Sequence, residues 1–182
     1  SLIWALPGCA LTWRKSREDP VAASFFQRQL ATYASYHRDG RNRATHFVGI
    51  PLIVFSLFIP LAWLRLDLAG HTISVGLLVG IAALALWIML DWAIGLAMAL
   101  VLAPMWYLGE RVASAGMTVG WIVFALAFVG GWVFQLVGHV FEGKRPALVD
   151  NLFQALIGPM FLMAEIFVWL WLRRHETVAG AH

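Results

Sequence analysis

Long uncharged stretches alternate with short polar segments along this chain. Residues 47–64, 72–90, 92–109 and 112–138 contain no Asp, Glu, Lys or Arg, and residues 151–172 contain a single ionisable side chain, Glu165. About 20 apolar residues are needed for a helix that spans the hydrocarbon core of a bilayer. The pattern therefore predicts an all-α fold, a polytopic membrane helix bundle of four to five transmembrane helices.

The polar segments complete the predicted domain organisation. Residues 1–19 form an N-terminal extension, for which we expect little regular structure and no cleaved signal peptide, because no basic segment precedes its apolar residues. Asp19 and Pro20 are typical of a helix start, and they predict an N-terminal amphipathic helix up to about Asp39, which lies on the membrane surface or packs under the bundle. We expect a single membrane-embedded domain over residues 20–176 and a tail of residues 177–182.

Residues typical of helix ends, caps and turns occur in three connections between the predicted helices. Gly40 is expected to end the surface helix in the left-handed conformation that glycine adopts readily, and Asn42 is a candidate N-cap for the first span. Residues 65–71 are predicted to form a short loop. Asp91 is predicted to be a turn residue, because only Asp91 and Trp92 separate the second apolar helix from the third.

The composition agrees with a membrane protein and excludes other classes. Of the 182 residues, 61% are hydrophobic and 13% charged, whereas soluble domains average about 45–50% and about 25%. The formal net charge of +3 does not indicate nucleic acid among the partners, because the cations fall between apolar runs and form no basic patch with exposed aromatic residues. The single cysteine, Cys9, excludes an internal disulfide and a cysteine-based metal site. Membrane lipid is the expected surrounding.

The basic residues predict which membrane face holds each polar segment. Seven Lys and Arg residues precede residue 47, and such a bias places the N-terminus in the cytoplasm. After four full crossings, the segment that contains Lys144 and Arg145 returns to the same face. We therefore expect an integral, multi-pass protein with its polar site on the cytoplasmic side, in the inner membrane if bacterial and the endoplasmic reticulum if eukaryotic.

Two polar segments at the ends of predicted spans contain imidazole, amide and carboxylate side chains. Their candidate members are Tyr36, His37, Asn42 and His46 in the first segment and Gln135, His139 and Glu142 in the second. Residues three and four apart share a helix face, and the count of crossings brings both segments to one membrane face. Three imidazoles and a carboxylate without thiolate suit Fe(II), Mn(II) or Zn(II), and two histidines with one carboxylate is the arrangement of non-haem Fe(II) oxygenases. The remaining polar residues are candidates to orient the ligands.

Each candidate also has a plainer interpretation. A single histidine at a membrane interface is usually there because its ring tolerates both water and lipid, so only the convergence of three favours a metal. The other histidines, His71, His175 and His182, are expected to be solvated.

The charged residues near the site have two interpretations each. The basic residues Arg38, Arg41, Arg43, Lys144 and Arg145 are most simply topology determinants, and the alternative is that one or two of them bind an anionic head group such as a fatty acid carboxylate. Glu165 lies within an apolar run, where an ionisable group costs at least about 2.5 kcal/mol. It either faces the bundle interior in a functional role or pairs with a cation near the far interface.

Three ordered sequence blocks resemble a known family. They are Tyr36-His37-x4-Asn42-x3-His46-x2-Gly49-x-Pro51, Gln135-x2-Gly138-His139-x2-Glu142-Gly143-Lys144-Arg145-Pro146-Ala147 and Pro159-x-Phe161-x3-Glu165. On these residues, the chain from about residue 30 to 172 resembles the membrane-embedded 2-hydroxy fatty acid dioxygenase family, whose fungal members act in phytosphingosine breakdown.

The resemblance implies Fe(II)-dependent α-oxidation, in which a 2-hydroxy fatty acid and O2 give the fatty acid one carbon shorter, without 2-oxoglutarate or haem. It implies that His37, His46 and His139 are the iron ligands, and that Glu142 completes the ligand set or receives a proton. Residues expected to act beside them are Tyr36, Asn42 and Gln135 in catalysis and Arg38, Lys144, Arg145 and Glu165 in substrate binding.

A non-enzymatic alternative stays open. A small polytopic transporter or assembly factor would use the histidines and Glu165 to couple to protons, without a metal. Two further classes are disfavoured: a desaturase or hydroxylase with two metals needs more histidines in tight clusters, and a lipid phosphatase needs a Ser-Gly-His motif in addition to Lys144-Arg145-Pro146.

Overall fold

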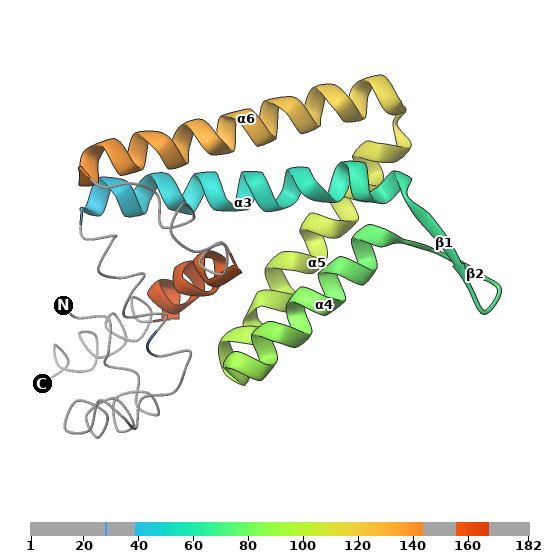
Figure 1. The fold of residues 1–182 in the computed structure, drawn as a ribbon, viewed down its shortest axis with the longest axis horizontal. Helices are drawn as coiled ribbons and strands as arrows, with labels where there is room; N and C mark the ends of the chain where they lie inside the picture. The colour runs from blue at the N-terminus through green and yellow to red at the C-terminus, as the bar shows by residue number, and fades with distance from the viewer. Residues whose placement is uncertain (1–27, 29–38, 144–155, 168–182) are drawn as a thin grey trace, which may run out of the picture.

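The computed structural model describes residues 28, 39–143 and 156–167 and shows a helix bundle with one small β-hairpin (Figure 1). The elements are α3 (Gly40–Trp63), β1 (Arg65–Leu68), β2 (His71–Ser74), α4 (Val75–Leu90), α5 (Trp92–Ser114), α6 (Met117–Glu142) and the helix Leu156–Phe167. The predicted helical architecture is confirmed for this part of the chain, except that a hairpin replaces the predicted loop. The N-terminal extension, the tail and nearly all of the predicted surface helix lie outside the described residues.

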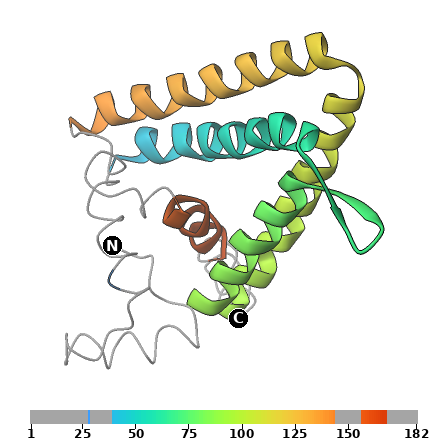
Figure 2. The same cartoon turned by 45° about the vertical axis from the view of Figure 1, so that its right-hand side comes forward.

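Helices α3 and α6 lie side by side and antiparallel (Figures 1 and 2). Glycines bring the two backbones together: a Cβ on Gly49 would lie 2.8 Å from the carbonyl oxygen of Gly131. Towards the other end of the pair, a Cβ on Gly120 would lie 2.5 Å from the indole of Trp63. Small residues allow such close approach between membrane helices. The start of α3 therefore lies beside the end of α6.

The start of α3 differs from the prediction. Asp39 is the N-cap, and its carboxylate accepts hydrogen bonds from the backbone N–H of Arg41 at 2.8 Å and from the Arg41 guanidinium at 2.9 Å. These bonds, the side-chain one foremost, lower the pKa of Asp39 to about 2. The prediction that Asn42 caps the helix is therefore wrong, because Asn42 is buried within the first turn.

Helices α4 and α5 form a tight helical hairpin. Asp91 ends α4 and caps α5, since its carboxylate accepts hydrogen bonds from the backbone N–H groups of Ala93 and Ile94 at 3.1 and 3.0 Å. The predicted turn at Asp91 is confirmed. With 16 residues, α4 is about 24 Å long at a rise of 1.5 Å per residue.

The Leu156–Phe167 helix packs against α3, α4 and α5. It contributes to a core cluster of Phe58, Trp87, Ile94, Met98, Leu102, Ile157, Met160, Phe161 and Ala164. Near its start, the carbonyl of Leu156 accepts a hydrogen bond from Trp87 at 3.0 Å, and near its end Glu165 pairs with Arg43.

Both contacts of this short helix lie at the same end of the bundle. Trp87 belongs to the last turn of α4 and Arg43 to the first turn of α3, and α4 returns towards the level at which α3 begins (Figure 1). The described part of the predicted fifth span therefore does not connect the two ends of the bundle. Glu165 has its cationic partner near the start of α3, which corrects the alternative of a partner at the far interface.

Three of the described helices, α3, α5 and α6, are long and apolar enough to cross a membrane. Large hydrophobic side chains on their outer faces, such as Leu100, Leu126 and Val140, are more than 70% exposed. Soluble proteins rarely expose large contiguous apolar patches, so these faces are suited to lipid. The number of full crossings and the cytoplasmic location of the polar segments stay predictions.

Candidate functional site

The two polar segments of the sequence meet where the start of α3 faces the end of α6. The rings of His46 and His139 lie edge to face, with 5.0 Å between their centroids and 81° between their planes. Both rings are buried, with residue exposures of 3% and 7%. The structure therefore brings together two of the three imidazoles that were predicted to share a site.

The imidazole of His46 is oriented by its own helix. Its Nδ1 lies 2.8 Å from the carbonyl oxygen of Asn42, one turn earlier. A carbonyl oxygen only accepts hydrogen bonds, so Nδ1 donates, and Nε2 is the acceptor nitrogen of the neutral ring. Metal-binding histidines are commonly held in this way, with the second ring N–H donated to a carbonyl or carboxylate.

Gly138 allows α6 to close over this turn of α3. A Cβ at this position would lie 2.5 Å from Oδ1 of Asn42 and 3.2 Å from Nδ1 of His46, and it would also clash with Oγ1 of Thr45. The Thr45 hydroxyl donates to the carbonyl of Asn42 at 2.7 Å. Without a side chain at position 138, these polar groups can face α6 directly and the two imidazoles can approach each other.

Two buried amides flank the histidines. Asn42 lies one turn before His46 in α3, and Gln135 lies one turn before His139 in α6. Within the described part of the chain, Nε2 of Gln135 has no hydrogen-bond partner. A buried N–H left without an acceptor costs about 1–3 kcal/mol, so Gln135 is placed to donate to a bound molecule.

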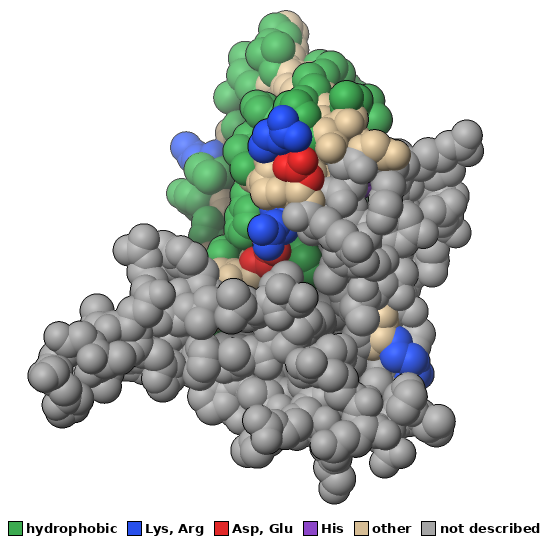
Figure 3. Space-filling view, turned by 90° about the vertical axis from the view of Figure 1, so that its left-hand side faces the viewer, with side chains coloured by type: hydrophobic (Ala, Val, Ile, Leu, Met, Phe, Trp, Pro, Cys, Tyr) green, Lys and Arg blue, Asp and Glu red, His purple; other side chains and the backbone are tan. Residues whose placement is uncertain are grey.

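An ion pair ties the first turn of α3 to the Leu156–Phe167 helix. Nη1 of Arg43 donates to Oε1 of Glu165 at 3.1 Å, and the side chains are 38% and 9% exposed. Figure 3 looks onto this end of the molecule, where basic and acidic side chains adjoin one another against hydrophobic surface. From the sequence, Arg43 was interpreted as a topology determinant or a ligand of an anionic head group, and its pairing with Glu165 was missed. Its position three residues before His46, which places it on a neighbouring part of the helix surface, was the available signal.

The other predicted site residues lie outside the described side chains. They are Tyr36, His37, Arg38, Glu142, Lys144 and Arg145; of these, Glu142 ends α6, but only its backbone is described. Among the described residues, no group of three His, Cys, Asp or Glu side chains is placed to hold a metal ion. A metal held by His46 and His139 therefore needs a further ligand from outside the described side chains, for which His37 and Glu142 are the predicted candidates.

Comparison with known proteins identifies the family. Residues 23–169, which include both polar segments and Glu165, match the family described as 2-hydroxy-palmitic acid dioxygenase Mpo1-like. The chain is 32% identical over 142 residues to the 2-hydroxy-palmitic acid dioxygenase MPO1 of Saccharomyces cerevisiae (strain ATCC 204508 / S288c), which covers 75% of this chain and 76% of the relative. No solved structure matches the chain significantly. The resemblance read from the three sequence blocks is confirmed, and the chain belongs to the family of 2-hydroxy-palmitic acid dioxygenase Mpo1-like proteins.

Proposed function

We propose that this protein is an Fe(II)-dependent dioxygenase of fatty acid α-oxidation, which converts a 2-hydroxy fatty acid and O2 to the fatty acid one carbon shorter. The observation that carries the proposal is the buried pair of imidazoles, His46 and His139, in a chain whose family is named for a 2-hydroxy-palmitic acid dioxygenase.

The side chains at the site suit iron. His46 presents Nε2 as its acceptor nitrogen because Nδ1 donates to the Asn42 carbonyl, and His139 lies against it on the facing helix. In the proposal, these two histidines and His37 hold the metal, with Glu142 as the candidate fourth ligand. Iron in such a nitrogen and oxygen ligand set supplies the electron-transfer chemistry by which O2 is activated.

The residues of the chain itself orient the reactants and exclude water. The Asn42 carbonyl fixes the ring of His46, and the buried Nε2 of Gln135 offers a hydrogen bond to an oxygen of the substrate. Burial of both imidazoles keeps bulk water away, which strengthens every polar interaction in the site. The expected roles of Tyr36 and Asn42 are likewise to position these groups.

Substrate binding divides between charge and apolar surface. Arg38, Lys144 and Arg145 are proposed to attract the fatty acid carboxylate through charge-assisted hydrogen bonds, on the cytoplasmic face of the membrane. Glu165 acts in this scheme by holding Arg43 in place beside the site. The acyl tail lies along the apolar helices, where each buried CH2 contributes about 0.8 kcal/mol.

Iron analysis and a product assay test the proposal together. The purified protein is loaded with Fe(II) under anaerobic conditions, desalted, and incubated with 2-hydroxypalmitate and O2. We expect one iron per chain and a fatty acid product one carbon shorter. A folded protein that neither retains iron nor consumes the substrate would overturn the proposal and favour a metal-free transporter or assembly factor.

A further inference from the structure

The β-hairpin between α3 and α4 has one polar and one largely apolar face. The facing pairs are Arg65 with Ser74, Leu66 with Ile73, Asp67 with Thr72, and Leu68 with His71. Because paired residues share a face and faces alternate along a strand, Leu66, Leu68 and Ile73, with His71 next to the turn, lie on the face opposite to Arg65 and Asp67. Leu66 and Leu68 are each 46% exposed. The hairpin therefore presents apolar side chains outside the helix bundle, from which it projects (Figures 1 and 2).

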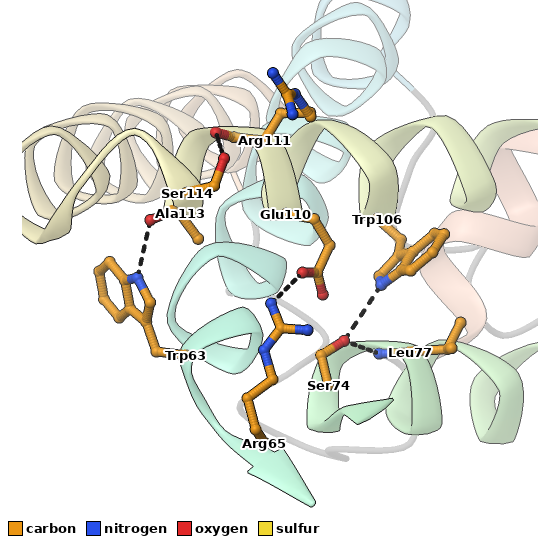
Figure 4. Close-up of polar contacts among 9 residues, drawn as sticks. All are labelled: Trp63, Arg65, Ser74, Leu77, Trp106, Glu110, Arg111, Ala113 and Ser114. Carbon is orange, nitrogen blue, oxygen red and sulfur yellow. Dashed lines mark hydrogen bonds and ion pairs between the residues drawn. The ribbon is translucent and has the colours of Figure 1, made fainter. Parts of the chain in front are cut away.

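Two contacts of the polar face determine the orientation of the hairpin relative to α5 (Figure 4). Nη2 of Arg65 pairs with Oε2 of Glu110 at 2.6 Å, and the indole N–H of Trp106 donates to Oγ of Ser74 at 3.5 Å. Glu110 and Trp106 both belong to α5. Arg65 in β1 and Ser74 in β2 lie on the same face of the hairpin, and both contact α5. The opposite face, which contains Leu66, is therefore turned away from α5.

The base of the hairpin lies beside the last turns of α5. Trp63, at the end of α3, donates its indole N–H to the carbonyl of Ala113 at 3.2 Å. After Trp63, Arg65 contacts Glu110 and Ser74 contacts Trp106, so these residues lie along α5 progressively closer to the middle of that helix. With 23 residues, α5 is about 35 Å long, so that its last turn, which contains Ala113, can reach beyond a hydrocarbon core of about 30 Å. The Arg65–Glu110 pair, about one turn earlier in α5, then lies near the boundary between the acyl chains and the polar head groups.

We propose that this hairpin anchors the protein in the membrane interface, with Leu66, Leu68 and Ile73 on the acyl chains and the polar face turned towards water and α5. The apolar face continues the exposed surface of Leu64 at the end of α3. Trp63, which lies beside it with its N–H bonded, is the type of residue enriched at membrane interfaces.

Lipid fits this face better than a protein partner. One face of two four-residue strands is far smaller than the roughly 800 Å² per partner of a stable protein interface. The charged side chains of the hairpin, Arg65 and Asp67, both lie on the other face, as they do in elements that rest on a bilayer surface.

Paired fluorescent labels on the two faces of β1 test the anchor. In the full chain carrying Cys9→Ser, Leu68→Cys and the matched control Asp67→Cys are labelled with the environment-sensitive dye NBD and reconstituted into phosphatidylcholine–phosphatidylglycerol vesicles. We expect the label at position 68 to emit at shorter wavelength and to be quenched by nitroxide-labelled lipid. The label at position 67 should be quenched by aqueous iodide instead.

A second pair on β2, Ile73→Cys and Thr72→Cys, repeats the comparison in case one label disturbs the turn, and circular dichroism confirms the helical fold of each variant. Equal quenching of the two faces by either reagent would overturn the proposal. A label at position 68 that is shielded from both reagents would also overturn it, because protein would then cover the face.

Discussion

The imidazole ring of His46 meets that of His139 edge to face, with 5.0 Å between the ring centroids. One ring comes from the first turns of α3 and the other from the last turns of α6. Their contact depends on the antiparallel pairing of the two helices and on the close approach at Gly138. The candidate site is therefore a property of the interface between α3 and α6, so that substitutions in this interface test it.

Removal of either imidazole should abolish the activity. We expect His46→Ala and His139→Ala to bring turnover of 2-hydroxypalmitate below detection and to lower the iron content, because each removes one of the two facing imidazoles that are proposed to bind the metal. His71→Ala, at the exposed tip of the hairpin, is the control and should retain both. Gel filtration and circular dichroism establish that the variants fold. Wild-type activity in either site variant would refute the site.

Gly138→Ala should separate the two helices at the site. The added methyl group would lie 2.5 Å from Oδ1 of Asn42, and overpacking of this kind costs about 1–3 kcal/mol. Gly130→Ala is the matched control on the same helix, where a Cβ meets no atom within 4 Å; alanine there should be neutral or stabilise the helix by about 0.5–1 kcal/mol. Thermal unfolding in detergent measures the difference. Equal midpoints for the two variants would contradict the packing at Gly138.

Gln135→Met should lower activity without lowering stability. Methionine fills a similar volume, and it removes a buried N–H that lacks an acceptor among the described residues, so the free energy of unfolding should stay constant or rise. If that N–H donates to the substrate, kcat/KM should fall about tenfold, the equivalent of a hydrogen bond of about 1.4 kcal/mol. Both quantities are measured on the same preparation. An unchanged kcat/KM would show that Gln135 does not touch the substrate.

The pair of Arg43 and Glu165 should behave as a coupled unit. Arg43→Met leaves the Glu165 carboxylate, which is only 9% exposed, without its counter-ion, and this should destabilise the protein more than Arg43→Met combined with Glu165→Gln. We expect an interaction energy of about 0.5–3 kcal/mol in a double-mutant cycle. Arg111→Met, at an exposed cation elsewhere, should have little effect. Additive effects of the two substitutions would mean that the ion pair contributes no stability.

The apolar runs predicted the helices better than their ends. Helix α4 starts three residues into its run, and α5 starts with its run at Trp92. Helix α3, in contrast, begins at Gly40 although its run begins at Phe47, because Asp39 caps a first turn whose polar side chains face α6 and Glu165. An apolar run marks the part of a helix that contacts lipid. A helix can extend beyond its apolar run when the next turn is polar and is buried against protein.

The β-hairpin was not predicted because its signals are weak. Its strands have four residues each, and its two-residue turn places Ala69 at φ 50° and Gly70 at φ 82°. Positive φ at both central residues is typical of a tight hairpin turn. Glycine adopts a positive φ readily, whereas alanine, which carries a Cβ, rarely does. In the sequence, therefore, only Gly70 indicated a tight turn.

Part of the site geometry followed from counting membrane crossings. An even number of crossings returns the chain to one face, which predicts that His46 and His139 lie at a similar depth. Lateral contact does not follow from such a count, since any two of the helices can be neighbours. In the structure, Gly49, Gly131 and Gly138 make α6 the neighbour of α3, a role that glycine in an apolar run does not reveal by itself.

The shortness of α4 has a consequence for the surrounding bilayer. At about 24 Å, this helix falls about 6 Å short of a typical hydrocarbon core of about 30 Å. The adjacent α5 is longer. Such hydrophobic mismatch is relieved when lipids thin locally or when a protein collects in thinner membranes. One flank of the bundle should therefore deform the bilayer, and the protein should partition towards membranes of lower thickness.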